Sequence, residues 1–281
     1  MINLNGTLHP GIENAITIEN RGYKYGDALF ETLKVVHSKI LFWEDHYFRL
    51  MSSMRILRME IPMNFTMEFL EAEILKTVDA NQLSKHTARV RFNVHRIDGG
   101  KYLPESNTID FNIIVENFNA SFYSLRENTF TVDLFKDYFV APGLLSTIKS
   151  NNKLIHILGN IYAKENKFDN CLLLNTNKNV VEGLNGNLFL VKDNVIKTPP
   201  IDDGCLKGIM RKQVIEIING FEDFEFVEAS ISPFELQKAD ELFLTNVIVG
   251  IQPVTAYRKK DYTNKVSKLI VDKLNIKIRL G

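Results

Sequence analysis

Cysteine is scarce in this chain of 281 residues, which contains only Cys171 and Cys205. Two thiols cannot build the disulfide framework of a small secreted domain, and so few cysteines are typical of a reducing compartment. The first residues also lack the basic start and the apolar core of a signal peptide. We therefore expect a cytoplasmic protein.

An excess of either charge is also missing, because 34 basic and 34 acidic side chains balance each other. Such a balance gives no indication of binding to nucleic acid or to an anionic membrane surface. No apolar run approaches the roughly 18 residues that a membrane-spanning helix requires. We therefore expect neither nucleic acid nor a membrane among the partners.

The composition that remains is that of a globular protein, with 45% hydrophobic and 24% charged residues. The length suits two domains of ordinary size. The hydrophobic pattern loosens over residues 117–129. We therefore predict a smaller N-terminal α/β domain over residues 1–118, a linker over 119–128 and a larger C-terminal domain over 129–281.

Hydrophobic periodicity predicts a mixed α/β (α+β) fold. Helices are expected over residues 44–57, 66–81, 154–162, 206–218, 233–236 and 265–280. Strands are expected over residues 16–18, 29–36, 88–95, 108–116, 130–134, 171–175, 187–192 and 239–246. Residues 21–27, with Gly22 and Gly26, are expected to form turns.

The most informative stretch runs from Ser146 to Pro200. Lys149 stands just before an apolar-periodic helix, and Glu182 ends a short apolar run between two predicted strands. A single lysine near a helix is usually only a solvated charge. The fixed order of lysine, helix, turn, carboxylate and strand makes a shared site the stronger interpretation.

This order resembles the fold-type IV pyridoxal-phosphate enzymes, which include branched-chain and D-amino-acid aminotransferases and aminodeoxychorismate lyase. The resemblance implies a two-domain fold with pyridoxal 5'-phosphate in the cleft between the domains, the C-terminal domain being the cofactor-binding one. It implies that Lys149 is the catalytic lysine that forms the Schiff base with the cofactor aldehyde. It implies that Glu182 pairs with the pyridine nitrogen, where a carboxylate keeps the ring protonated and able to accept electrons. It also implies a small-molecule amino substrate and a homodimer.

The resemblance further implies the residues that hold the cofactor phosphate. Arg49, in the motif His46-x-x-Arg49-Leu50, matches an arginine whose guanidinium fork suits phosphate. Ile209 and Met210 open a helix whose first backbone amides form a phosphate seat. Asn246 and Val247 match a further phosphate-binding segment. Aminotransferases often have threonine at the positions of Met210 and Val247, where this chain offers no hydroxyl.

Four residues are candidates for contact with the substrate. Phe30 matches an aromatic residue of the substrate pocket, although an ordinary core position explains it equally well. Arg96 and Lys101 flank the Gly99-Gly100 loop, which suits a substrate carboxylate or is a hairpin loop with surface charges. Lys153 follows Asn152 where branched-chain aminotransferases carry a nearby tyrosine. Arg89 and Arg91 alternate along a predicted strand and are expected to face solvent or a partner.

The branch of the family follows from the same residues. Lys153, Met210, Asn246 with Val247, and the Gly99-Gly100-Lys101 loop favour aminodeoxychorismate lyase, which eliminates pyruvate and leaves p-aminobenzoate. The motif Phe30-Glu31-Thr32 resembles that of aminotransferases and favours an aminotransferase of branched-chain or D-amino acids. A third possibility, a cofactor carrier without catalysis, is disfavoured because Lys149 and Glu182 are both present.

Overall fold

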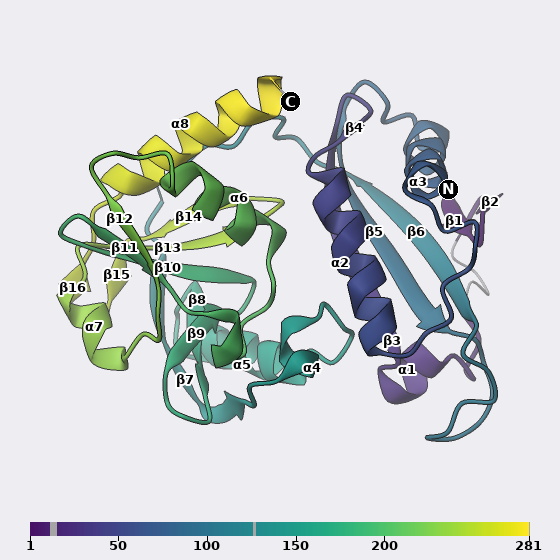
Figure 1. The fold of residues 1–281 in the computed structure, drawn as a ribbon, viewed down its shortest axis with the longest axis horizontal. Coiled ribbons are helices and arrows are strands. Elements are labelled where there is room, and N and C mark those ends of the chain that lie inside the picture. The colour runs from purple at the N-terminus through teal and green to yellow at the C-terminus, as the bar shows by residue number, and fades with distance from the viewer. Residues whose placement is uncertain (12–15, 126–127, 281) are drawn as a thin grey trace. The chain divides into compact units, whose positions relative to one another are not determined.

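Contacts divide the chain into two compact units, which are described separately below. The computed structural model describes residues 1–11, 16–125 and 128–280 (Figure 1). One unit comprises Met1–Ser121 together with Ile148–Asn152, and the other comprises Phe122–Thr147 together with Lys153–Gly281. The short segment Ile148–Asn152 thus groups with the N-terminal residues, although the division expected from the sequence assigned it to the C-terminal domain. The reason is hydrogen bonding, since Phe30 N donates to Lys149 O and Asn151 N donates to Ala28 O.

The first unit is built on a six-stranded antiparallel sheet in the order β2-β1-β6-β5-β3-β4. Its strands are β1 (Ile2–Leu4), β2 (Thr7–His9), β3 (Ala28–Val36), β4 (Lys39–Ile40), β5 (Thr87–Arg96) and β6 (Ile109–Asn117). Its helices are α1 (Arg21–Tyr25), α2 (Trp43–Ile56) and α3 (Met67–Ala80). The predicted helices over residues 44–57 and 66–81 are confirmed as α2 and α3, and the predicted strands over 29–36, 88–95 and 108–116 are confirmed as β3, β5 and β6.

Alternation along β5 gives this sheet two different faces. Ala88, Val90, Phe92 and Val94 are fully buried and join α2 and α3 in one core. The side chains between them are polar or charged and only partly buried. The apolar face therefore packs in the core of the unit, and the polar face is accessible for binding a ligand.

The N-terminal prediction was wrong at two places. Residues 16–18 form bends and a turn rather than a strand, and residues 21–25 form the helix α1 rather than a turn. The Asn20 side chain caps this helix by accepting a hydrogen bond from Tyr23 N, and Gly26 ends it with a φ of 66°. An asparagine that accepts a backbone hydrogen bond and a glycine with positive φ occur at the ends of helices as well as in turns. The sequence alone therefore does not distinguish the two structures.

The second unit is built on a ten-stranded mixed sheet in the order β12-β11-β10-β9-β8-β7-β15-β16, with β13 paired to β10 and to β14. Its strands are β7 (Thr131–Val140), β8 (Asn170–Asn175), β9 (Val180–Gly183), β10 (Gly186–Lys192), β11 (Val195–Thr198), β12 (Glu225–Glu228), β13 (Glu241–Asn246), β14 (Gly250–Val254), β15 (Ala256–Tyr257) and β16 (Lys260–Asp261). Its helices are α4 (Leu144–Thr147), α5 (Leu154–Glu165), the 3-10 helix η1 (Ile201–Asp203), α6 (Ile209–Ile218), α7 (Pro233–Lys238) and α8 (Lys265–Leu280). The predicted closing helix over residues 265–280 is confirmed.

Helix α5 is unusual in exposing much of its apolar face. Leu154, Ile157 and Ile161 are 73%, 53% and 48% exposed, whereas Gly159 and Ala163 are buried against the sheet. Most of the apolar stripe that predicted this helix is therefore exposed, although Tyr162 at its end packs against Phe135. Among the residues that the structure describes, no helix has the length and apolar character needed to cross a membrane.

Candidate functional site

Lys149 lies on the segment that runs beside the start of β3. Its backbone oxygen accepts a hydrogen bond of 2.9 Å from Phe30 N, and its Nζ lies 4.5 Å from the centre of the Phe30 ring. The lysine side chain is partly buried. Phe30 is therefore a neighbour of Lys149, on the sheet face that the helices do not cover.

A buried charge cluster lies on the other side of the same strand. Glu31 accepts hydrogen bonds from Arg49 Nε, at 2.8 Å, and from Arg49 Nη2. The same carboxylate lies 2.7 Å from His46 Nδ1. Burial alone would raise the pKa of Glu31, but the charge of Arg49 and the hydrogen bond with His46 lower it to about 2. The cluster anchors Arg49 firmly to β3.

His46 completes this cluster and is fully buried. Burial lowers the pKa of His46, and the hydrogen bond with Glu31 opposes this effect. The charges of Arg49 and of the nearby Lys149 lower the pKa further. The Nε2 atom of His46 has no hydrogen-bond partner among the described residues. A neutral imidazole therefore lies close to Lys149, within electrostatic reach of the amine.

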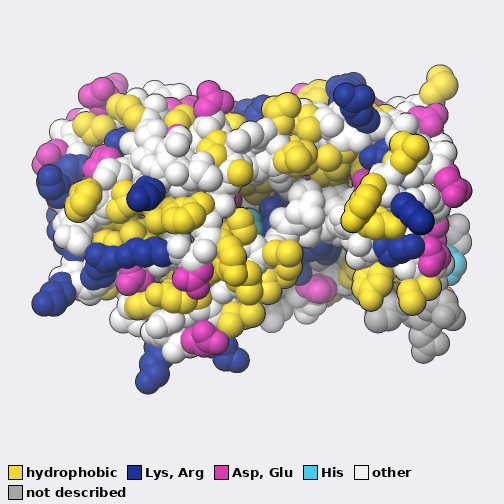
Figure 2. All heavy atoms as spheres, turned by 90° about the horizontal axis from the view of Figure 1, so that it is seen from below, with side chains coloured by type: hydrophobic (Ala, Val, Ile, Leu, Met, Phe, Trp, Pro, Cys, Tyr) yellow, Lys and Arg dark blue, Asp and Glu magenta, His cyan; other side chains and the backbone are white. Residues whose placement is uncertain are grey.

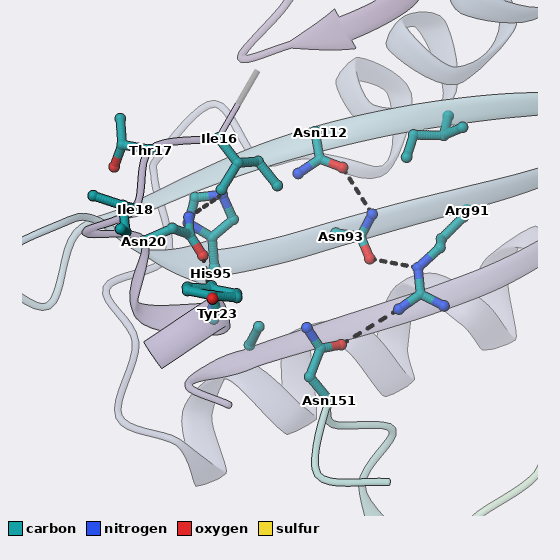
Figure 3. Close-up of a pocket in the computed structure, with 13 residues that line it drawn as sticks. Ile16, Thr17, Ile18, Asn20, Tyr23, Arg91, Asn93, His95, Asn112 and Asn151 are labelled. Atoms are coloured by element: carbon teal, nitrogen blue, oxygen red, sulfur yellow. Dashed lines mark hydrogen bonds between the residues drawn. The ribbon is translucent and has the colours of Figure 1, made fainter. Parts of the chain in front are cut away.

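A pocket of about 590 Å³ opens on the uncovered face of the first unit. Figure 3 shows that polar side chains line one wall, in a hydrogen-bonded chain that runs Asn151–Arg91–Asn93–Asn112. Arg91 Nε donates to Asn93 at 2.8 Å, and Asn93 donates to Asn112 at 2.7 Å. The pocket therefore offers several carboxamides and one guanidinium to a ligand.

Arg91 connects this pocket to Lys149. Its guanidinium carbon lies 3.9 Å from the centre of the Phe30 ring, which Lys149 also contacts at 4.5 Å. Arg91 and Lys149 therefore both lie against the ring of Phe30. The expectation that Arg91 faces solvent or a partner needs correction, because Arg91 lines the pocket. Arg89, two residues earlier, is half-exposed and pairs with Glu116 at 2.7 Å.

Arg96 belongs to the other face of β5 and does not meet the expectation of a substrate contact. Its guanidinium donates to Asp27, to Asn107 and to the backbone oxygens of Leu57 and Arg58. The side chain is buried. Because its nitrogens are engaged within the protein, Arg96 fastens the end of α2 to β5.

Lys101 lies in the loop after β5, and its side chain is exposed. The loop is held from within, because Arg21 donates to the backbone oxygens of Gly99 and Lys101 at 2.9 and 2.7 Å. A side chain on Gly100 would overlap Leu103 O. The glycine pair therefore shapes the loop, and Lys101 remains a candidate that no contact described within its unit tests.

Glu182 is the central acid of the second unit, where it is 5% exposed. Its Oε2 accepts a hydrogen bond of 2.9 Å from Leu206 N, and its Oε1 lies 3.4 Å from His156 Nε2. A buried carboxylate with these partners is held in one orientation. Sequence reasoning singled out Glu182 but missed His156.

The strands place Glu182 in a row of polar side chains. Asn187 on β10 stands opposite Glu182 on β9 and opposite Thr245 on β13. Asn187 also donates to Leu206 O at 2.8 Å, just before α6. The Thr245 hydroxyl is buried and lacks a hydrogen-bond partner among the described residues. The row therefore joins the acid to the start of α6 and to the end of β13.

Helix α6 begins at Ile209 after the cap residue Gly208. Ile209 and Met210 are both buried, and their amides belong to the first turn, where the backbone N–H groups have no partner within the helix. A side chain on Gly208 would overlap the Asn187 side-chain oxygen. This close approach keeps the start of the helix against β10.

The turn after β13 is fixed by Asn246 and Val247. The Asn246 side chain accepts hydrogen bonds from Ile248 N and Val249 N and donates to Asn185 O. Val247 O accepts a hydrogen bond of 2.7 Å from Tyr123 Oη. The Val247 side chain is buried, and only the backbone groups of this residue can form hydrogen bonds.

Lys153 occupies the N-cap position of α5, where its backbone oxygen accepts a hydrogen bond from Ile157 N. It belongs to the second unit, whereas Lys149 belongs to the first. The two lysines are separated by only three residues, yet they have different surroundings.

Sequence reasoning missed Glu31, His46, Arg91 and His156 as candidates. Only two of them carried a usable signal: Glu31 adjoins Phe30, and His46 stands three residues before Arg49, one helical turn away. Arg91 and His156 depend on contacts between distant segments. Such contacts cannot be read from spacing along one element.

Comparison with known proteins agrees with this geometry. A family model described as amino-transferase class IV matches residues 28–257. A "putative branched-chain-amino-acid aminotransferase" of Methanocaldococcus jannaschii is 30% identical over 99% of this chain and 95% of its own length. The aminodeoxychorismate lyase of Vibrio harveyi is 24% identical over 85% of this chain and 86% of its own.

Solved structures show the same fold. The branched-chain aminotransferase of Thermoproteus uzoniensis superposes with a TM-score of 0.86 at 24% identity, covering 97% of this chain and 92% of its own. The expected fold class and the resemblance to fold-type IV enzymes are thereby confirmed. Together with the match over residues 28–257, this shows that the chain belongs to the class IV aminotransferase family of pyridoxal-phosphate-dependent enzymes.

Proposed function

We propose that this enzyme is an aminodeoxychorismate lyase, which removes pyruvate from its substrate and leaves p-aminobenzoate. The observation that carries the proposal is the polar wall of the pocket beside Lys149. An aliphatic amino acid has a single carboxylate, which one cation can bind, and its side chain offers no polar group to the row of carboxamides. Aminodeoxychorismate carries two carboxylates and a ring amine, which such a wall can bind.

The side chains of both units suit pyridoxal phosphate. Lys149 offers the amine that the aldehyde requires, and Glu182 offers a buried acceptor for the ring nitrogen. The first-turn amides of α6 at Ile209 and Met210 suit a phosphate. The buried Thr245 hydroxyl, without a described partner, supports a polar group nearby. Bound pyridoxal phosphate supplies an electron sink for the bond that breaks at the substrate Cα.

We assign the proton transfers to Lys149. An amine acts as a general base only when it is unprotonated, and neighbouring cations favour that state. Arg91 shares the Phe30 ring with Lys149, and Arg49 lies in the adjoining cluster with His46. Lys149 is therefore placed to take the proton from Cα and to return it. Arg49, anchored by Glu31, is the proposed phosphate-binding cation.

The cations proposed to bind the substrate carboxylates differ in one residue from those expected from the sequence. Arg96 is replaced by Arg91, because Arg96 is engaged in structural hydrogen bonds. Lys101 and Lys153 stay candidates for the second carboxylate, and Asn246 and Val247 stay candidates for the phosphate. A point charge such as lysine suits a contact of loose geometry.

An assay with two substrate classes tests the proposal. The purified enzyme with pyridoxal phosphate should release pyruvate and p-aminobenzoate from aminodeoxychorismate. It should do so much faster than it transaminates leucine or D-alanine with 2-oxoglutarate. Ready turnover of leucine or D-alanine, without pyruvate release from aminodeoxychorismate, would refute the lyase assignment.

The alternative function is transamination of branched-chain or D-amino acids. The 30% identity to the protein from Methanocaldococcus jannaschii over nearly the whole chain favours this reading. Both reactions need the same roles for Lys149, Glu182 and Arg49. The remote third function, a cofactor carrier without catalysis, would leave the amine of Lys149 without a task.

We propose that the enzyme works as a homodimer. Apolar side chains of α4 and α5, at Leu144, Leu145, Leu154, Ile157 and Ile161, are between 48% and 73% exposed. Figure 2 shows apolar side chains gathered on the side of the second unit where α4 and α5 lie. A contiguous apolar surface of this kind is typical of an interface, and a second copy is the partner that the family resemblance implies. We also propose a cytoplasmic location, in keeping with two buried and unpaired cysteines.

A further inference from the structure

We propose that His156 is a positioning residue for Glu182, which holds the carboxylate in place and adjusts how it shares a proton with the cofactor ring nitrogen. The inference rests on the proposed role of Glu182 and adds a residue to that site. His156 Nε2 lies 3.4 Å from Glu182 Oε1, in a part of the second unit where both side chains are largely buried.

The close packing of α5 brings the two residues together. Gly159, one turn after His156, lies so near Leu184 that a side chain on it would overlap Leu184 Cδ2. Leu184 follows β9, the strand that carries Glu182. The glycine therefore allows α5 to approach β9 closely, and His156 on the same helix face reaches the carboxylate.

Each carboxylate oxygen of Glu182 then has its own neighbour. Oε2 accepts from Leu206 N at 2.9 Å, and Oε1 faces His156. Burial and the charge of Glu182 raise the pKa of the adjacent Cys205 thiol to about 12. Cys205 is therefore a neutral thiol and brings no competing anion to the site.

The position of the imidazole proton follows from its partners. Nδ1 of His156 is buried and has no hydrogen-bond partner among the described residues. In the neutral ring, a proton on Nε2 faces Glu182 and leaves an acceptor at Nδ1 rather than an unpaired N–H. In this tautomer the polarised N–H group of His156 lies on the side of the ring nearest Glu182, with Nε2 at 3.4 Å from Oε1.

An imidazole beside Oε1 has two proposed consequences for the carboxylate. It restricts rotation of Glu182 to the orientation already fixed by Leu206. Its N–H dipole also stabilises the negative charge of the carboxylate. The proton shared with the cofactor ring then stays on the ring nitrogen. His156 thus acts on the cofactor through Glu182.

Nitrogen-15 resonance of the bound cofactor tests this role without measuring activity. The full chain is loaded with pyridoxal phosphate labelled at the ring nitrogen, and the signal is compared in wild type, His156→Phe, His156→Gln and Glu182→Gln. The wild type should show a protonated ring nitrogen. Phenylalanine should lower the protonated fraction at neutral pH several-fold, whereas glutamine, whose amide reaches the place of Nε2, should largely retain it.

Turnover gives a second readout. His156→Phe should lower kcat about tenfold, because the carboxylate loses its polar neighbour at Oε1, with KM nearly unchanged. His156→Gln should restore most of kcat. A merely structural role would instead lower the melting temperature without moving the nitrogen signal.

The outcomes separate the inference from its premise. A signal unchanged by Glu182→Gln would remove Glu182 from the ring nitrogen and overturn the inference with it. A signal that moves in Glu182→Gln but not in His156→Phe would overturn the role of His156 alone. Should His156→Phe fail to fold, His156→Gln and His156→Asn carry the test. Only glutamine should retain the protonated signal, and equal signals in both would refute the proposal.

Discussion

Arg91 and Arg89 occupy the same face of one strand, yet only Arg91 lines the pocket. Replacing Arg91 with alanine removes a cation stacked on Phe30. We expect KM for aminodeoxychorismate to rise by about 10- to 100-fold, because a charge-assisted hydrogen bond contributes about 1.5–3 kcal/mol. Arg89→Ala, which breaks only an exposed pair with Glu116, is the matched control and should leave KM unchanged. A similar rise in both variants would contradict the pocket assignment.

Lys149 and Lys153 can be distinguished chemically. Borohydride should fix the cofactor covalently to the peptide that carries Lys149, and the visible absorption band should disappear. Mass spectrometry of the digested protein identifies the labelled residue. Lys149→Ala should prevent the labelling, whereas Lys153→Ala should retain it. Labelling on Lys153 would show that the wrong lysine was chosen.

At the scale of an element, α2 is attached to β3 by the Glu31 cluster. The pKa of Glu31 lies at about 2 in the folded protein, well below the ordinary value of 4.5. A carboxyl with a lowered pKa stabilises the fold above its unfolded pKa and loses that contribution as the pH falls toward its folded pKa. This pair of values corresponds to about 3 kcal/mol, present at neutral pH and lost between about pH 4.5 and pH 2.

Glu31→Gln tests this contribution. The variant should be less stable by about 3 kcal/mol at pH 7, and its stability should fall less steeply in acid. Urea unfolding of the variant and of the wild type, at pH 7 and between about pH 4.5 and pH 2, measures the difference in stability. The fluorescence of Trp43, the single tryptophan of the chain, reports unfolding at the start of α2. Parallel acid curves for the variant and the wild type would contradict the assigned charge cluster.

Helix α6 offers a second test at this scale. Gly208→Ala would push Asn187 away from the helix start, where the first-turn amides lie. Overpacking of this kind costs about 1–3 kcal/mol, and we expect cofactor affinity to fall by about 5- to 150-fold. Gly220→Ala, beyond the other end of the helix, meets only Ile217 O at 3.4 Å and is the control. Equal cofactor affinity in the two variants, measured by fluorescence titration, would remove the helix start from the phosphate site.

The helices were the elements most accessible to prediction. The helices expected over residues 66–81 and 265–280 match α3 and α8, and the structure shows that Thr66 caps α3. The short helix α1 was not accessible, because its cap and its glycine also occur in turns.

The cations show where prediction from sequence stops. Alternation placed Arg89 and Arg91 on one face of β5 and Arg96 on the other. Alternation cannot tell which face is covered by helices. Arg96 was therefore assigned to the substrate and Arg91 to solvent or a partner, whereas Arg96 is buried beneath the end of α2 and Arg91 lines the pocket.

At the scale of the molecule, the exposed face of α5 is the interface of the proposed homodimer. Ile157→Asp places a charge in the middle of the apolar patch, and a buried unpaired charge strongly disfavours association. We expect this variant to sediment as a monomer at concentrations where the wild type is a dimer. Phe234→Asp, on the equally exposed α7, is the control and should not change the sedimentation. Dimers that persist in Ile157→Asp would place the interface elsewhere.

Neither unit is a continuous piece of the chain, since Ile148–Asn152 belongs with Met1–Ser121. A gene fragment that ends at Ser121 would lack Ile148, which is buried in the core of the first unit, and would lack Lys149 as well. The first unit is therefore not a module that recombination could transfer intact. A fragment that contains the proposed Schiff-base lysine and begins at Met1 must also contain Phe122–Thr147, which belongs to the second unit.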